Sequence, residues 1–278
     1  MGYYTRKARV FASKTRKANT KNDYIVVIPS YKREQTVQTK TLATLQRYNI
    51  PADKITIFVA NEEQLQTYKK AVPRSLYKNL IVGVPGLAQV RNFILDHYPI
   101  GTKIVMMDDD VTGFVERTEE GGIRPLRSLQ DVIHTGFTAA KNEGASLWGV
   151  YPVPNGFFMN PNVTNDLKFI IGSFWGIINP GATKKGGILL PMSEKEDYIR
   201  TLMAWDRDGT VVRINYVSPK TAYYKEPGGM QTDPKRMENQ KKAVAFLLKT
   251  WPDKVRINTR RKSAYPEILL RRMKKIDR

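Results

Sequence analysis

The chain has 278 residues, enough for one large domain or for one domain with an appendage. It contains no cysteine and two histidines. This composition excludes a disulfide scaffold, cysteine-ligated zinc and thiol catalysis, and it argues against a multi-histidine metal site. No stretch approaches ~18 uninterrupted apolar residues, and the basic N-terminus lacks an apolar segment, so the sequence predicts neither a membrane span nor a signal peptide. We therefore expect a protein of a reducing compartment, the cytoplasm.

The formal net charge of +20 is concentrated at the two ends of the chain. Residues 1–22 carry seven basic residues and no acid, residues 234–278 carry fifteen basic and four acidic residues, and residues 23–233 are left with +2. One short basic run is often only a solvated surface. Two runs at opposite ends favour a polyanionic partner bound through its phosphates. Neither end has the bulky apolar face of a membrane-lying helix, so we expect nucleic acid rather than a membrane.

In chain order, the first half alternates between β-branched apolar runs and amphipathic segments. The runs at 24–30, 55–60, 80–84 and 103–107 predict strands, and the segments at 36–48, at 64–71 and after Pro85-Gly86 predict helices. This alternation predicts an α/β fold, a mostly parallel sheet with helices on both faces. Ligands bind such sheets at the carboxyl ends of the strands, where this chain places residues 30–33, residues 61–63, Gly86 and three consecutive aspartates.

The second half is less regular. Helices are predicted at 128–142, from Ser193 onward and at 235–250, and strands at 147–153, 168–178 and 211–217. A final basic helix is expected at 267–276. The chain therefore divides into a basic flexible arm (1–22), a main domain (23–233) and a basic helical extension (234–278) that packs on the core.

Asp108-Asp109-Asp110 directly follow a strand that is predicted to be buried. Three adjacent carboxylates repel one another there, and a divalent cation is the simplest compensation. On an extended backbone Asp108 and Asp110 point to the same side, so both can reach one ion. Oxygen ligands of this kind suit Mg²⁺ or Mn²⁺ held jointly with a phosphate. The alternative is a solvent-exposed acidic turn.

Four other features each allow a functional and a structural interpretation. Glu196 and Asp197 supply either a general base or only the favourable acidic first turn of a helix. Arg91 lies on a helix that begins after Gly86, where a phosphate or a plain tight turn fits equally well. The two remaining features are Phe174-Trp175, which would stack on an acceptor or lie in the core, and Lys225, which would close a loop on a diphosphate or belong to a simple turn.

Five motifs in order over residues 24–200 resemble those of the nucleotide-sugar glycosyltransferases of the GT-A fold. They are Val26 to Arg33, Val59 to Glu62, Gly86 to Asn92, Met107 to Asp110, and Glu196-Asp197. Within that class the chain is similar to the glycosyltransferases associated with the TET/base-J dioxygenases, which occur in phages and eukaryotes. Those enzymes are thought to add sugars to hydroxymethylated pyrimidines in DNA. The narrower likeness rests on overall similarity, on Gly228-Gly229 and on the basic charge.

This resemblance implies a role for each motif. The nucleoside of a UDP-sugar would be held by Pro29, Tyr31, Arg33, Asn61 and Glu62, and the rest of the nucleotide by Gly86, Arg91, Asp108, Asp109 and Lys225. Asp108 and Asp110 would carry Mn²⁺ or Mg²⁺ with the diphosphate. Asp197, or alternatively Glu196, would be the base of an inverting transfer, and Phe174 and Trp175 would contact the acceptor. Many enzymes of this class supply a late histidine to the metal, but no histidine follows His134. The third ligand would then be missing, or replaced by Asp233 or water.

Charge and resemblance together lead to one expectation. The chain would be a monomeric, metal-dependent, phage-type glycosyltransferase of the host cytoplasm that moves a sugar from a UDP-sugar to the hydroxymethyl group of 5-hydroxymethylcytosine or 5-hydroxymethyluracil in DNA, with inversion. If configuration is retained, the role of Asp197 fails and the metal role stands. One rival is a glycosyltransferase for a glycan or protein, which leaves the basic ends unexplained. The other is a non-catalytic DNA-binding module, which does not need Asp108 and Asp110.

Overall fold

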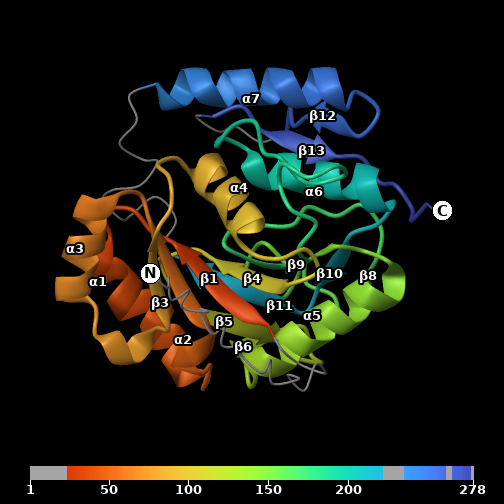
Figure 1. Ribbon diagram of the computed structural model, residues 1–278. Helices are drawn as coiled ribbons and strands as arrows, with labels where there is room; N and C mark the ends of the chain where they lie inside the picture. The colour runs from red at the N-terminus through yellow and green to blue at the C-terminus, as the bar shows by residue number, and fades with distance from the viewer. Residues whose placement is uncertain (1–23, 222–234, 261–264, 277–278) are drawn as a thin grey trace, which may run out of the picture.

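The computed structural model describes residues 24–221, 235–260 and 265–276, to which all structural statements refer. These residues form three layers, a central sheet between two groups of helices (Figure 1). The sheet has eight strands in the order β3-β2-β1-β4-β9-β7-β10-β8. Their bounds are β1 Ile25–Pro29, β2 Ile55–Val59, β3 Asn79–Val82, β4 Lys103–Met107, β7 Leu147–Val150, β8 Val163–Thr164, β9 Phe174–Ile178 and β10 Val212–Ile214. The predicted α/β class is confirmed, and the predicted arm at 1–22 lies outside the described residues.

The direction of the strands defines a functional edge. β1 pairs in parallel with both β2 and β4, and β7 pairs in parallel with β10. β9 runs antiparallel between β4 and β7, so β4 and β7 point the same way. From β1 the chain proceeds outward through β2 and β3, then returns to the other side of β1 as β4. This reversal of strand order creates a crevice at the carboxyl ends of β1 and β4, the usual ligand position in open α/β sheets.

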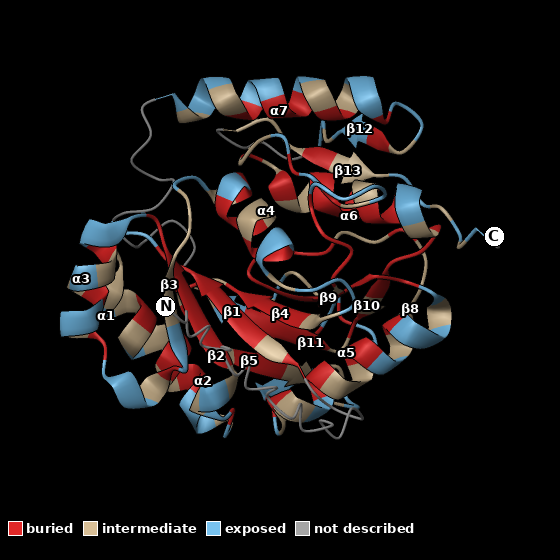
Figure 2. Ribbon diagram, in the orientation of Figure 1, coloured by how far each residue is buried: buried red, intermediate tan, exposed pale blue. Residues whose placement is uncertain are grey.

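Helices cover both faces of the sheet (Figure 1). One face carries α1 (Glu34–Thr36), a π-helical segment η1 (Val37–Leu42), α2 (Ala43–Arg47), α3 (Glu62–Ala71) and α5 (Leu129–Glu143). The other face carries α4 (Leu87–His97), α6 (Glu196–Asp208) and α7 (Arg236–Thr250), and the short helices η2 (Ala52–Lys54) and η3 (Arg74–Leu76) lie in connections. Successive residues of β1 serve opposite faces, with Val26 and Ile28 in one core and Val27 in the other. Figure 2 shows the strands buried between these layers.

A second, smaller sheet was not predicted. β5 (Val111–Arg117) begins at the residue after Asp110 and pairs antiparallel with β6 (Ile123–Pro125) and with β11 (Val217–Thr221). Two predicted elements are shorter than expected, because the helix predicted from Ser193 begins at Glu196 and the strand predicted at 168–178 covers only β9.

The C-terminal extension is helical only in part. α7 packs Ala243, Val244 and Leu247 inward, and Figure 2 shows its opposite side exposed. The basic helix expected at 267–276 is wrong, since this segment contains β13 (Ile268–Leu270), which pairs antiparallel with β12 (Val255–Ile257). In the described part of the chain, no helix is both long and apolar enough to cross a membrane.

Candidate active site

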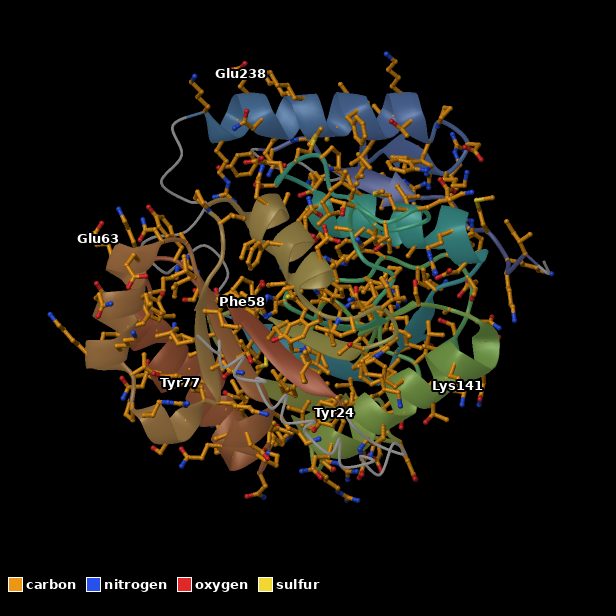
Figure 3. The ribbon with its side chains drawn as sticks, viewed as in Figure 1. Tyr24, Phe58, Glu63, Tyr77, Lys141 and Glu238 are labelled. Carbon is orange, nitrogen blue, oxygen red and sulfur yellow. The ribbon has the colours of Figure 1, made fainter. Side chains whose placement is uncertain are left out.

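A cleft of about 710 Å³ opens at the carboxyl ends of β1, β2 and β4. Its walls come from the loops after β1, β2, β3 and β4, from residues 191–194, and from the first turn of α7. Phe58 of β2, labelled in Figure 3, forms part of the wall. Its ring packs edge-on against Phe93 of α4 and against Tyr98, the residue after α4. The cleft therefore lies where the strand order predicts a ligand site.

Two arginines hold the three aspartates in this cleft, Arg91 at Asp108 and Arg33 at Asp109 and Asp110. Asp108 Oδ1 accepts a hydrogen bond of 2.9 Å from the guanidinium of Arg91. Asp109 accepts from the Ser30 hydroxyl at 2.7 Å and from Arg33 at 3.0 Å, and its side chain is only 8% exposed. Asp110 lies 3.9 Å from Arg33. Asp109 is thus engaged in fixing the loop after β1, whereas the side chains of Asp108 and Asp110 are 35% and 15% exposed.

The backbone of the aspartate turn is fixed by two threonines. Thr41, fully buried in the π-helical segment, donates its hydroxyl to the carbonyl of Asp108 at 2.7 Å and accepts from the amide of Val111 at 3.0 Å. Thr44, one turn later, donates to the carbonyl of Val111 at 3.1 Å. A π-helical turn within an α-helix often marks a functional site. Here it directs Thr41 at both ends of the turn, so the position of the aspartates is set before any ligand binds.

The aspartates fit a divalent cation held by few protein ligands. Burial raises the pKa of Asp108 to about 7, and the charges of Asp110 and Asp109 add to the rise while Arg91 opposes it. Bringing a cation beside Asp108 and Asp110 would relieve this repulsion. Within the described residues no three His, Asp or Glu side chains are grouped to hold a metal. Two carboxylates completed by phosphate oxygens and water match the way proteins bind Mg²⁺.

Arg91 and Glu196 belong to a buried ion-pair network rather than to the surface of the cleft. Arg91 is 1% exposed, and besides Asp108 it binds the carbonyl of Gly172 at 3.1 Å and the carboxylate of Glu196. Glu196, 4% exposed, also accepts from Arg200 at 2.7 Å. Burial lowers the pKa of Arg91 and of Arg200 to about 10, so both remain charged at neutral pH. Neither side chain lines the cleft in this structure. Arg91 meets the cleft only through Asp108, and a role of Arg91 at the nucleotide or of Glu196 as the base stays a prediction.

Two further carboxylates, Asp197 and Glu194, lie at the start of α6 and just before it. Asp197 is half-buried in the first turn of α6, and its charge acts on Arg91 and Arg200. It does not line the cleft, whereas Glu194, which is 7% exposed, does. The neighbouring Ser193 accepts a hydrogen bond of 3.1 Å from the amide of Ala88, which fixes residues 193–194 against the start of α4. The sequence analysis assigned no role to Glu194.

The nucleoside-binding residues expected from the resemblance divide into two groups. Lining residues of the cleft include Pro29, Tyr31, Arg33 and Gly86, as well as Asp108, Asp109 and Asp110. Asn61 and Glu62 do not line it. Asn61 caps α3 by accepting from the amide of Gln64 at 2.9 Å, and Glu62 accepts from the side chain of Gln66 at 2.7 Å. The contacts of Asn61 and Glu62 are therefore those of residues that begin helix α3.

Phe174 and Trp175, which were expected to stack on an acceptor, are core residues in this structure, 0% and 1% exposed. Phe174 packs edge-on against Phe114 and Trp148. The Trp175 ring lies 3.9 Å from the guanidinium carbon of Arg200, which covers its face. No face of either ring is left for a ligand.

The first turn of α7 supplies a wall of the cleft that the sequence analysis did not identify. Arg236 and Asn239 line it opposite the loops of the main sheet. Lys225 and Asp233, which were considered for the diphosphate and for the metal, lie outside the described residues. Among the described lining residues, Arg33 and Arg236 are the two cations. Arg33 donates to Asp109, and the guanidinium carbon of Arg236 lies 5.2 Å from the centre of the Tyr265 ring.

Residues 24–140 match the family described as TET-Associated Glycosyltransferase. Among solved structures, the chain is similar to TarS of S. aureus, with 14% identity and a TM-score of 0.49 over 81% of this chain and 39% of that one. It is also similar to the mannosyltransferase PcManGT of Pyrobaculum calidifontis in complex with GDP-Man and Mn²⁺, with 14% identity and a TM-score of 0.47 over 83% of this chain and 64% of that one. The chain thus spans less than two thirds of either protein. No curated protein matches it.

Proposed function

We propose that this chain, whose residues 24–140 match the family described as TET-Associated Glycosyltransferase, is a glycosyltransferase. It would transfer a sugar from a UDP-sugar to the hydroxymethyl group of a 5-hydroxymethylpyrimidine in DNA, with inversion at the anomeric carbon. The observation that carries the proposal is the pair Asp108 and Asp110, which line a cleft at the strand-order reversal. We further propose that the protein acts as a monomer in the compartment that holds DNA and nucleotide sugars.

The donor would lie in the cleft with its diphosphate toward the aspartates. Asp108 and Asp110 would hold Mn²⁺ or Mg²⁺, which when bound neutralises charge on the leaving diphosphate. Arg236 supplies a positive charge on the opposite wall, where it would bind the diphosphate. Asp109 would not contact the donor directly, because its carboxylate is engaged by Ser30 and Arg33. Pro29, Tyr31 and Gly86 would then surround the nucleoside.

The transfer needs a base for the attacking hydroxyl. As the hydroxymethyl oxygen forms its bond to the anomeric carbon, its proton passes to a carboxylate and the bond to the diphosphate oxygen breaks, which releases UDP. We propose Asp197 for this role on the resemblance of Glu196-Asp197. Glu194 is the alternative, because it lines the cleft in this structure. Substitution of each residue separately will distinguish them.

A DNA acceptor is supported by the charge of the extension. Exposed basic residues cover the described part of this segment, among them Lys241, Lys242, Lys249, Arg256, Arg271, Arg272 and Lys274. Such a surface binds backbone phosphates without reading sequence. A base that is stacked inside a duplex cannot reach a donor bound in the cleft, so the modified base must be flipped out of the helix.

The test is an incubation of the protein with Mn²⁺, a panel of UDP-sugars and duplex DNA that contains cytosine, 5-hydroxymethylcytosine or 5-hydroxymethyluracil, followed by mass analysis of the nucleosides. We expect a mass gain of one sugar on a hydroxymethylated base only, and its loss in Asp110→Asn. Asp197→Asn should abolish transfer and keep UDP binding, whereas Glu194→Gln should leave transfer intact. UDP release without modified DNA would contradict the DNA acceptor and favour a glycan or protein. Absence of both UDP release and UDP-sugar binding would favour a binding module.

A further inference from the structure

One residue beside the cleft has a backbone conformation that its side chain disfavours. Lys32 has a φ of 54°, in the left-handed region, and it lies between Tyr31 and Arg33, which both line the cleft. In the described part of the chain, the other residues apart from glycine with positive φ are Asn49 and Lys195. Asparagine adopts this conformation more readily than most residues, whereas lysine has no such preference. A strained residue beside a ligand cleft points to a functional reason for the strain.

A buried side chain of α3 holds Lys32 in this conformation. The side-chain oxygen of Gln64, a residue that is 6% exposed, accepts a hydrogen bond of 2.7 Å from the amide of Lys32. The backbone amide of Gln64 in turn donates to the side chain of Asn61 at 2.9 Å, so the acceptor belongs to the capped first turn of a helix. Gln64 thus offsets the strain at Lys32 with a hydrogen bond from a rigid element.

A second side chain of α3 holds the rest of the same loop. Tyr68, fully buried one turn further along the helix, accepts from the amide of Arg33 at 3.0 Å, and its hydroxyl lies 2.7 Å from that of Ser30. Because Ser30 gives its own proton to Asp109, Tyr68 is the donor to Ser30. The loop after β1 is therefore fixed from α3, while Tyr31 is left 41% exposed in the wall of the cleft.

We propose that Gln64 is a positioning residue for the donor. It keeps Lys32 in its left-handed conformation, so that Tyr31 and Arg33 both line the cleft before the nucleotide binds. The inference rests on the proposed binding of a UDP-sugar in this cleft. Without the hydrogen bond from its amide, Lys32 is expected to relax to a negative φ, which is favoured over the left-handed conformation by about 5- to 30-fold. Since apparent affinity falls with the fraction of protein that is competent to bind, UDP affinity should fall by a similar factor.

The test measures UDP affinity by calorimetry in the presence of Mn²⁺, separately from sugar transfer. Gln64→Leu removes the acceptor atom at a similar side-chain volume. It should weaken UDP binding and raise the KM for the UDP-sugar about 5- to 30-fold, with kcat unchanged. Adding Lys32→Gly should restore most of the affinity, because glycine adopts positive φ without strain. Adding Lys32→Ala instead should not restore it, since alanine keeps the β-carbon, and this difference separates the backbone conformation from the loss of the lysine charge.

A second pair of variants tests the same conformation without a change in the core, because Lys32 is exposed. Lys32→Val should lose UDP affinity, since a β-branched residue is strongly disfavoured at positive φ, whereas Lys32→Gly should keep it although both variants remove the same charge. Asn49→Val is the matched control, because Asn49 has a φ of 53° but is not among the residues that line the cleft. It should lower stability in urea and leave UDP affinity unchanged.

The outcomes separate this inference from the proposed function. Wild-type UDP affinity in Gln64→Leu and Lys32→Val would overturn the positioning role while leaving the proposed transfer intact. Equal affinity in the glycine and alanine double variants would also overturn it. A wild-type protein that binds no UDP would contradict the proposed donor and the positioning role together. The expected pattern of UDP affinities without sugar transfer to DNA would support the role of Gln64 and contradict the proposed acceptor.

Discussion

Replacing Arg91 by methionine tests whether the buried ion-pair network holds the site together. Arg91 is 1% exposed and contacts Asp108, Glu196 and the carbonyl of Gly172. Methionine fills a similar length without charge. Glu196 then keeps Arg200 as its partner, whereas Asp108 loses its counter-charge.

The magnitude follows from the cost of leaving a buried charge without its partner. Removing one member of a buried ion pair typically costs about 3–5 kcal/mol. Burial lowers the pKa of Arg91 to about 10 even with its carboxylate partners present, so the charged form is poorly solvated at this site. We therefore expect Arg91→Met to lower the free energy of unfolding by about 3–5 kcal/mol. It should also raise the pKa of Asp108 further, so that Mn²⁺ binding weakens as the pH falls below neutral.

Urea unfolding at pH 7 measures the first effect, and titration of Mn²⁺ at pH 6.5 and 8 measures the second. The control is Arg124→Met, because Arg124 is 44% exposed and pairs with Glu116 at 2.7 Å on the surface. An exposed pair of this kind contributes less than about 1 kcal/mol. An equal loss of unfolding free energy in the two variants would refute the view that burial makes the Arg91 ion pairs important for stability.

Three further predictions concern the cleft and its supports. Thr41→Val removes both hydrogen bonds across the aspartate turn, so the affinities for Mn²⁺ and UDP, measured by calorimetry, should fall about 10-fold. Thr41→Ser keeps the hydroxyl and should bind both ligands as the wild type does. Equal affinities in all three proteins would contradict this. Arg236→Ala should raise the KM for the UDP-sugar about 10-fold without changing the KM for DNA, and the reverse pattern in steady-state kinetics would place Arg236 on the acceptor. Burial raises the pKa of Tyr68 to about 12, so stability that is present below pH 10 should be lost by about 3 kcal/mol as the pH rises to 12. Tyr68→Phe should remove that loss in urea unfolding, and an unchanged pH profile would show that Tyr68 is not its source.

The first half of the fold was predictable because each element there carries its own signal. The four apolar runs became β1 to β4, and the helix expected after Gly86 became α4. The aspartates were expected at a strand end and line the cleft. Local patterns suffice here because a parallel strand buried on both faces must be apolar throughout.

Other residues lie in surroundings that the sequence analysis did not predict, because those surroundings depend on side chains far away in the sequence. The sequence around Phe174-Trp175 does not specify that Arg200 and Trp148 cover these rings. Nor does it specify that Arg91 meets Glu196, 105 residues away. Long-range pairing of this kind leaves no periodic signal along the chain. The same holds for Arg236, which reaches the cleft only because α7 lies over α4 and α6 (Figure 1).

That return of α7 has a consequence for synthesis of the chain. The aspartate turn and its threonines are complete by Val111, and the wall at Glu194 follows 83 residues later. The last wall of the cleft, at Asn239, is synthesised 45 residues after Glu194. At 5–20 residues per second this interval lasts roughly 2–9 s. During translation the carboxylates are thus assembled before the cleft is closed, and a nascent chain should acquire tight donor binding only once α7 has emerged from the ribosome.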